Sequence, residues 1–191
     1  MDVIESREDH VLIRYMCRTH RIGLPGRHQA RNAALAISAI RSLRDSGRIV
    51  QFMDIGLESA RLPARMEKLD GVPIILDATH TRKGAECLRD DIGEIHGKVL
   101  LVTGMLSDKD LRGVAEALSP IASKVYVSAP DSPRAADKEA LASCYRMYHN
   151  DVSVYPTVGE AVKKALEEGT TVLVTGSFRT AEDCLRWLET R

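Results

Sequence analysis

The sequence of this protein lacks an excess of charge of either sign: Lys and Arg together number 27, and Asp and Glu together also number 27. Such a chain creates no net positive field to attract a nucleic acid backbone or an anionic membrane surface. We therefore expect no nucleic acid among its partners. The hydrophobic fraction of 44% and the charged fraction of 28% are ordinary for a soluble globular protein and exclude a disordered or fibrous chain.

Long apolar runs are also missing. No window approaches the roughly 18 consecutive apolar residues of a membrane-spanning helix. The first residues, MDVIESREDH, carry charges where a signal peptide would need an apolar core. The sequence therefore predicts a cytoplasmic protein without membrane contact.

Clustered metal ligands are a third absence. The four cysteines are widely scattered, with no CxxC pair and no histidine nearby at metal-binding spacing: Cys17, Cys87, Cys144 and Cys184. Since a structural zinc site needs clustered ligands, we predict no metal site in this chain and expect reduced, mostly packed thiols.

From about Lys98 onward, short β-rich runs alternate with amphipathic stretches, which is typical of a parallel sheet covered by helices. The strands are nearly continuous apolar runs, as expected where both faces of a sheet are buried. We predict strands at Val72–Leu76, Val99–Thr103, Lys124–Val127 and Thr171–Thr175, and a shorter one at Val152–Tyr155.

Helical apolar spacing fills the intervals between these strands. The predicted helices are Lys83–Ile95, Asp108–Leu118, Ala135–Tyr148, Val158–Glu168 and Thr180–Leu188. Ser107 and Thr157 are the expected N-caps of two of them, with Glu160 completing a capping box after Thr157.

The first seventy residues do not follow this alternation. A turn at Gly23–Gly26 leads into a predicted helix over His28–Leu43, with one apolar face formed by Ala33, Ala36, Ile37, Ile40 and Leu43. A second short helix is predicted over Val50–Ser59. Val11–Tyr15 has β character, but the sequence identifies no partner strand for it.

Four local patterns occur in a fixed order and together resemble one family. They are GLPGRHQARNAALA (23–36), LPARME (62–67), ILDATHTRKGAE (75–86) with GMLSDKD (104–110), and VLVTGSF (172–178). The set is similar to the later part of the folylpolyglutamate and dihydrofolate synthases of the Mur ligase superfamily. In those enzymes, an HQxxN helix ends the central domain. The last domain contains a PGR turn, a DxAHNP loop and a Gly-Ser pair at the end of its terminal strand.

This resemblance implies an α/β fold and a division of the chain. Residues 61–191 would be the Mur ligase C-terminal domain, a Rossmann-like, mostly parallel sheet with flanking helices. Residues 1–60 would be the short tail of a central ATPase-type domain. The family uses ATP to form an acyl phosphate on a carboxylate, which the amine of glutamate attacks, so the implied partners are ATP, glutamate and a folate or another pterin.

Five residues take implied roles from the family positions that they match. Asn32 resembles the Asn that contacts the adenine side of ATP, Arg65 the Arg that reaches the phosphates, and Asp77 the Asp that holds the ribose. His80 matches the loop histidine near the reaction centre and is the candidate catalytic residue. Ser177 matches the terminal GS serine and is a further candidate for nucleotide contact. A guanidinium offers fixed donors to phosphate oxygens, and a carboxylate can accept two sugar hydroxyls.

The chain departs from the family pattern in three respects. Thr81-Arg82 replaces the Asn-Pro after the histidine, which should loosen that loop, and Arg82 could serve an anionic substrate or lie in solvent. Ala64 replaces the glycine before the phosphate arginine. Nothing matches GxxxxGK[ST], the backbone cradle for a triphosphate, so a phosphate-loop partner and the Mg²⁺ ligands are expected outside this chain.

Simpler interpretations remain for the same residues. Asp77 could be a cap or turn former, His80 a hydrogen-bonded loop histidine, and Arg65 the partner of Glu67 in a surface ion pair. The segment Asp131–Arg134 resembles a family motif but is equally a plain turn. Three hypotheses stay open: part of a folate-type ligase, a non-catalytic binding or regulatory module with the same fold, and part of a Mur-type ligase with another substrate.

Overall fold

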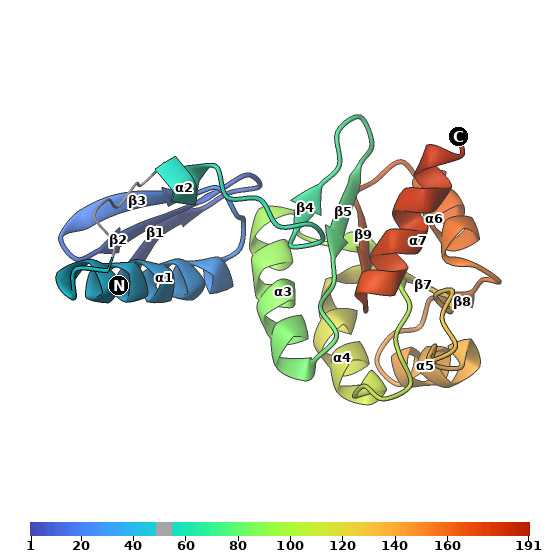
Figure 1. The fold of residues 1–191 in the computed structure, drawn as a ribbon. Coiled ribbons are helices and arrows are strands. Elements are labelled where there is room, and N and C mark those ends of the chain that lie inside the picture. The colour runs from blue at the N-terminus through green and yellow to red at the C-terminus, as the bar shows by residue number, and fades with distance from the viewer. Residues whose placement is uncertain (49–54) are drawn as a thin grey trace. The chain divides into compact units, whose positions relative to one another are not determined.

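The computed structural model describes residues 1–48 and 55–191. They form two compact units, residues 1–62 and residues 63–191, each with a sheet and a core of its own (Figure 1). No helix in the described part of the chain is long and apolar enough to cross a membrane.

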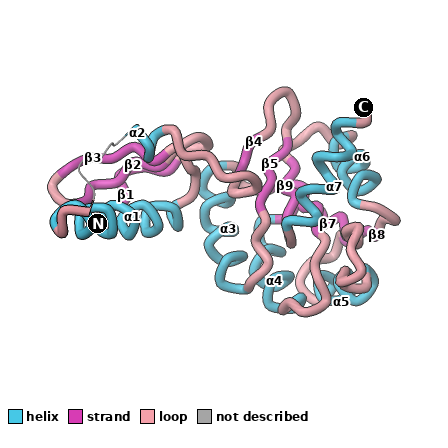
Figure 2. The backbone as a smooth tube through the Cα atoms, viewed as in Figure 1, coloured by secondary structure: helices cyan, strands magenta, loops and turns pink. Residues whose placement is uncertain are grey.

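A six-stranded sheet forms the centre of the carboxyl-terminal unit, in the order β4-β5-β9-β6-β7-β8 (Figure 2). The strands are β4 (Glu67–Lys68), β5 (Ile74–Asp77), β6 (Val99–Thr103), β7 (Ala122–Val127), β8 (Val152–Val154) and β9 (Val172–Thr175). All neighbours from β5 to β8 run parallel, and β4 alone pairs antiparallel, with β5. Every residue of β5, β6 and β9 is buried, which explains their unbroken apolar runs.

Helices cover both faces of this sheet. The first face packs against α3 (Arg82–Ile95), α4 (Leu111–Leu118) and α5 (Lys138–Arg146), and a 3-10 turn over Ser119–Ile121 follows α4. The second face packs against α6 (Val158–Leu166) and α7 (Phe178–Glu189). The predicted α/β fold with a mostly parallel sheet is therefore confirmed.

In the carboxyl-terminal unit, the largest differences from the predicted boundaries are at the starts of two helices. The helix expected from Asp108 begins at Leu111, and its N-cap is Asp110 rather than Ser107. The helix expected from Ala135 begins at Lys138. Both shifts have one cause, because Leu106 forms a β-bridge with Ala135 and the Ser107 N–H donates to the Arg134 carbonyl, so these two loops pair with each other instead of entering helices. The Thr157 cap is confirmed, since its hydroxyl accepts from the Glu160 N–H at 3.2 Å.

The amino-terminal unit is a three-stranded antiparallel sheet with one long helix. Its elements are β1 (Asp2–Ser6), β2 (Val11–Tyr15), β3 (Arg18–Ile22), α1 (Arg27–Asp45) and α2 (Ile55–Glu58). Its core is formed by buried residues of β2, β3 and α1: Val11, Ile13, Ile22, Ala30, Ala33 and Ile37.

Several expectations for this unit were wrong or incomplete. Strand β2 has two partners where none was expected. The helix face predicted to be apolar is only partly buried: Ala36 and Leu43 are exposed, and the buried row runs through Gln29, Ala30, Ala33 and Ile37. Of the short helix predicted over Val50–Ser59, residues 50–54 lie outside the described residues, and α2 covers Ile55–Glu58.

The turn from β9 into α7 requires a glycine at position 176. We predict that replacing it lowers the free energy of unfolding by a measurable amount. Gly176 has φ +113°, and an added Cβ would lie 2.4 Å from the Gly104 carbonyl oxygen. Gly169 has φ +73° but an added Cβ there meets nothing within 4 Å. Gly169→Ala should therefore cost about 1 kcal/mol of strain, and Gly176→Ala should cost at least about 2 kcal/mol more because backbone atoms must also move.

The measurement is urea denaturation followed by the fluorescence of Trp187, the single tryptophan, which belongs to the carboxyl-terminal unit. Equal losses of unfolding free energy in the two variants would contradict the close backbone approach at Gly176.

The four cysteines are free thiols with different exposure, which predicts different reactivity. Cys184 is 0% exposed, and burial raises the pKa of its thiol to about 12. Cys17 is exposed. Since the thiolate is the reactive form, an aromatic disulfide reagent at about pH 8 should modify Cys17 rapidly and Cys184 only after unfolding. Cys17→Ser should remove the fast phase, and rapid modification of Cys184 in the native protein would contradict its burial.

Candidate functional site

Four of the five predicted site residues meet at one edge of the six-stranded sheet. Asp77 is the last residue of β5, and its register partner on β9 is Thr175, two residues before Ser177. His80 follows in the loop between β5 and α3, and Arg65 precedes β4, which pairs with β5. The carboxyl ends of parallel strands are where α/β folds form ligand crevices.

Asp77 anchors this edge. It is 1% exposed, and its Oδ2 accepts from the Met66 N–H at 3.0 Å while its Oδ1 accepts from the Thr79 N–H at 2.8 Å. Burial raises the pKa of the Asp77 carboxyl above its ordinary 3.8, although Thr79, Met66 and the Arg65 charge oppose that change. Because the folded state then holds the proton more tightly than the unfolded state, ionisation of Asp77 costs stability as the pH rises above about 3.8.

The turn that carries Arg65 is held in an unusual conformation. Ala64 and Met66, on either side of Arg65, have φ of 51° and 49°, in the left-handed region that glycine tolerates best. Hydrogen bonds hold the turn: the Ala64 N–H donates to Glu67 Oε2 at 2.8 Å, and the Ala64 carbonyl accepts from the Ala78 N–H at 2.9 Å. The family glycine that Ala64 replaces therefore stands where the backbone needs a positive φ.

Among the described residues, no carboxylate forms an ion pair with the Arg65 side chain, and its Cζ lies 5.6 Å from the centroid of the Phe178 ring. The simpler interpretation of an Arg65–Glu67 pair is wrong, because Glu67 instead accepts from the Ala64 backbone. Arg65 thus presents a half-buried guanidinium beside the anchored carboxylate of Asp77.

His80 is half-buried, and its ring is oriented by the backbone. Its Nδ1 lies 2.9 Å from the Ala78 carbonyl oxygen. A carbonyl can only accept, so Nδ1 carries the proton and Nε2 of the neutral ring is an acceptor. The loop is further tied to β9, because the Thr175 hydroxyl donates to the Thr79 carbonyl at 3.4 Å.

Ser177 serves as the N-cap of α7. Its Oγ accepts from the Thr180 N–H at 3.0 Å and lies 2.8 Å from the Thr180 hydroxyl, and the residue is only 4% exposed. The Thr180 hydroxyl in turn donates to the Gly104 carbonyl at 2.6 Å, which links α7 to the end of β6. The geometry therefore gives Ser177 a structural role, and its contact with a nucleotide stays a prediction.

The replacement of Asn-Pro by Thr81-Arg82 leaves an ordered turn. Thr81 caps α3 by accepting from the Gly84 N–H at 3.2 Å, which stabilises the helix start as a proline at the next position would. Arg82 pairs with Glu116 at 3.1 Å and Glu86 at 3.5 Å, and its side chain is 55% exposed to solvent. Similarly, Asp131–Arg134 is a turn in which Arg134 pairs with Asp108 at 2.9 Å.

Asn32 lies apart from these residues in the chain, on α1 of the amino-terminal unit. It is exposed, and its Nδ2 donates to Gln29 Oε1 at 2.9 Å. Gln29 is 3% exposed and its Nε2 lies 3.0 Å from His28 Nε2, so the two residues support Asn32. The helix starts after Gly26, a position that offers no side-chain cap.

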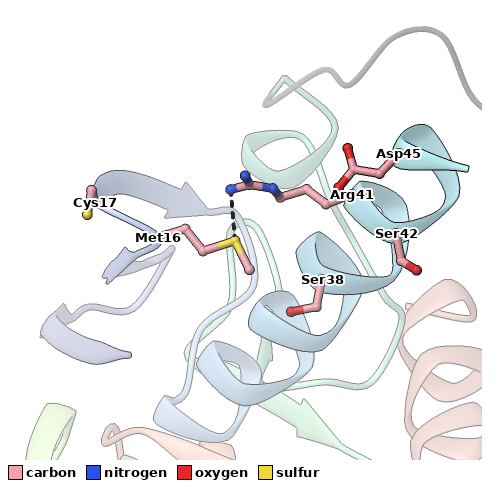
Figure 3. A pocket seen from close by; sticks show the side chains of 6 residues that line it. All are labelled: Met16, Cys17, Ser38, Arg41, Ser42 and Asp45. Carbon is pink, nitrogen blue, oxygen red and sulfur yellow. Dashed lines mark hydrogen bonds between the residues drawn. The ribbon is translucent and has the colours of Figure 1, made fainter.

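A hollow in the amino-terminal unit does not involve the predicted residues. It measures about 680 Å³ and is lined by the β2–β3 turn and by polar residues of α1 (Figure 3): Met16, Cys17, Ser38, Arg41, Ser42 and Asp45. Arg41 donates to the Met16 sulfur at 3.0 Å across it. No group of three or more His, Cys, Asp or Glu side chains in the described part of the chain could hold a metal ion.

Three residues near the site were missed as contributors. Thr79 binds Asp77, Glu67 closes the Arg65 turn, and Phe178 contacts the Arg65 guanidinium. All three stand inside the quoted motifs. The contacts of Thr79 and Glu67 are local, within two and three residues, whereas the contact of Phe178 with Arg65 joins segments that are far apart in the sequence.

The positive φ at Ala64 leads to a prediction that needs no ligand. Ala64→Gly relieves left-handed strain, whereas Ala161→Gly, at a buried position of α6, loses helix propensity of about 1 kcal/mol. Both variants lose one buried methyl and gain the same freedom in the unfolded chain. Ala64→Gly should therefore be less destabilising by about 1–2 kcal/mol in urea denaturation. Equal destabilisation would contradict the strain at Ala64.

Comparison with known proteins places this geometry in a family. Residues 64–178, more than half of the chain, match the model of the Mur ligase, glutamate ligase domain. The Escherichia coli dihydrofolate synthase/folylpolyglutamate synthase is 33% identical over 165 residues, 84% of this chain and 38% of that protein. The Mycobacterium tuberculosis protein of the same name is 35% identical over 126 residues, 62% of this chain and 26% of that protein.

Solved structures of related proteins have a similar fold. A Mycobacterium tuberculosis folylpolyglutamate synthase complexed with ADP and AMPPCP matches with a TM-score of 0.81 and 26% identity, over 99% of this chain and 48% of that one. Escherichia coli FolC in complex with DHPP and ADP matches with a TM-score of 0.76 and 28% identity, over 95% of this chain and 44% of that one. The chain thus spans less than half of these relatives. It belongs to the Mur ligase glutamate ligase domain family and corresponds to the carboxyl-terminal part of folylpolyglutamate synthase-type proteins.

Proposed function

We propose that this chain supplies the nucleotide-closing, carboxyl-terminal part of an ATP-dependent ligase that joins glutamate to a folate-like carboxylate. Residues 61–191 are the last domain in this proposal, and residues 1–60 are the tail of a central ATPase-type domain. The observation that carries it is the set of Arg65, Asp77 and His80 at one sheet edge, in a chain whose relatives were solved with ADP.

The residues at this edge fit an anionic nucleotide in part. Arg65 has no ion-pair partner among the described residues, and such a guanidinium suits phosphate oxygens. In the other unit, the exposed Asn32 amide suits the polar edge of a base. Asp77 fits less directly, because it is 1% exposed and each of its oxygens already accepts a backbone N–H. Its contact with a ribose stays a prediction, and its present bonds support a second role in holding the Arg65 turn.

His80 has the geometry for an acceptor in this site. When the ring is neutral and Nδ1 donates to the Ala78 carbonyl, Nε2 is the ring atom that can accept a hydrogen bond. ATP would supply the phosphoryl group that activates the carboxylate as an acyl phosphate. The chain's own share is to bind and orient the phosphates through Arg65 and to place His80 beside them.

The remaining parts of such a ligase would come from elsewhere. No GxxxxGK[ST] segment occurs in the sequence, so a phosphate loop and the Mg²⁺ ligands belong to a partner domain, on the same or another polypeptide. The cytoplasmic location stays a prediction. One observation favours the alternative of a non-catalytic module: Arg82, the cation that follows the His80 loop, already has two carboxylate partners in Glu86 and Glu116.

The test is ADP release in the presence of ATP, Mg²⁺, glutamate and a reduced folate. The chain is assayed alone and together with candidate phosphate-loop proteins from its source. We expect release only in the mixture. Release by the chain alone would contradict the proposal that the phosphate loop lies outside this chain. No release in either assay would favour the non-catalytic module.

Arg65→Gln is the site variant for the same assay, and Arg146→Gln is its matched control. Arg146 is a half-exposed arginine on α5 that pairs with Glu139 at 3.3 Å. Loss of charge-assisted bonds to phosphate should lower ADP release by Arg65→Gln about 10-fold or more, while Arg146→Gln should match the unchanged chain. Equal rates in both variants would contradict the phosphate role of Arg65.

A further inference from the structure

Phe178 is an aromatic residue whose position is not explained by the core. It is the first residue of α7 and is 54% exposed. The buried face of that helix is formed by Thr180, Ala181 and Cys184 instead. Because an aromatic ring at a helix start gains little from such partial burial, its contact with Arg65 is the feature to explain.

The contact joins a cation to a ring rather than to a carboxylate. The Arg65 Cζ lies 5.6 Å from the Phe178 centroid, within the range of a cation–π interaction. A carboxylate partner would occupy one or two of the five N–H donors of a guanidinium. A ring attracts the same cation and leaves all of its donors available for an oxyanion.

Both sides of the contact are held by constrained backbone. Arg65 stands between Ala64 and Met66, both with positive φ, in a turn bound to Asp77 at the end of β5. Phe178 follows Gly176 and the Ser177 cap at the end of β9, the strand next to β5. Two segments more than a hundred residues apart in the sequence are thus fixed at the ends of the adjacent strands β5 and β9, with these side chains in contact.

We infer that Phe178 is a positioning residue that holds the Arg65 guanidinium through its ring, so that the donors of Arg65 stay available for a phosphate. This inference rests on the proposed role of Arg65 in phosphate binding. It assigns to Phe178 no contact with substrate of its own.

The first experiment tests the contact in the full chain without any ligand. The NMR resonances of the Arg65 Hδ and Hε protons should show the upfield displacement that an aromatic ring causes. Phe178→Leu, which keeps an apolar side chain but removes the ring, should abolish this displacement. Phe178→Trp should keep it, and urea denaturation followed by circular dichroism verifies that both variants are folded. A displacement unchanged in Phe178→Leu would overturn the inference.

The second experiment tests positioning, with tripolyphosphate as the probe and the Arg65 Nε–H resonance as the readout. We expect Phe178→Leu to weaken the apparent affinity about two- to fivefold, the equivalent of one exposed cation–π contact, and Phe178→Trp to restore it. The Arg146 resonance reports the effect of ionic strength alone. Unchanged affinity in Phe178→Leu would show that the ring touches Arg65 without positioning it and would overturn the inference.

The two failures can be told apart. If the Arg65 resonance of the unaltered chain does not respond to tripolyphosphate beyond the change at Arg146, the phosphate role of Arg65 fails, and the positioning role of Phe178 fails with it. If that resonance responds but the Phe178 variants do not differ, only the inference about Phe178 fails.

Discussion

The hydrogen bonds of the buried Asp77 carboxylate are the interaction on which the candidate site depends. One oxygen holds the Met66 N–H and the other holds the Thr79 N–H, so a single side chain joins the turn of Arg65 to the loop of His80. Burying a carboxylate is costly unless its oxygens are bonded, and the raised pKa of Asp77 reflects that cost. The donors around it offset part of the penalty and give both loops fixed positions relative to β5.

The backbone at this edge also adopts conformations that cost stability and fix the positions of the site residues. Ala64 and Met66 adopt positive φ without being glycine, and Gly176 approaches the Gly104 carbonyl closely. Strained conformations persist where the surrounding structure determines them and are found preferentially at functional sites. In this protein they flank Arg65 and Ser177, two residues that the sequence had singled out.

The sequence predicted the carboxyl-terminal unit well because its buried strands are continuous apolar runs between clear helix signals. It missed β1 and β3 for a definable reason. The β2–β3 turn has Met16 and Cys17 at φ of 50° and 59°, where an Asn-Gly pair would have signalled a two-residue hairpin. The start of α4 was misplaced since Ser107 is as good a cap as Asp110, and only the long-range bridge from Leu106 to Ala135 decides between them.

For the site, family motifs predicted which residues matter but not what each one touches. The burial of Asp77 and the contact between Phe178 and Arg65 depend on the order of strands in the sheet, which places β9 beside β5. No local pattern carries that order, because residues 77 and 175 become neighbours only when the sheet forms.

The two-residue strand β4 has a consequence for the behaviour of the protein in solution. Without Glu67 and Lys68, strand β5 would be an open edge of the sheet, with a free row of backbone donors and acceptors able to pair with another chain. A short, charged strand is a common means of blocking such pairing. Because β4 begins directly after the Arg65 turn, a substitution that unfolds this turn would also expose the edge of β5. Aggregation through that edge would then accompany the loss of the site.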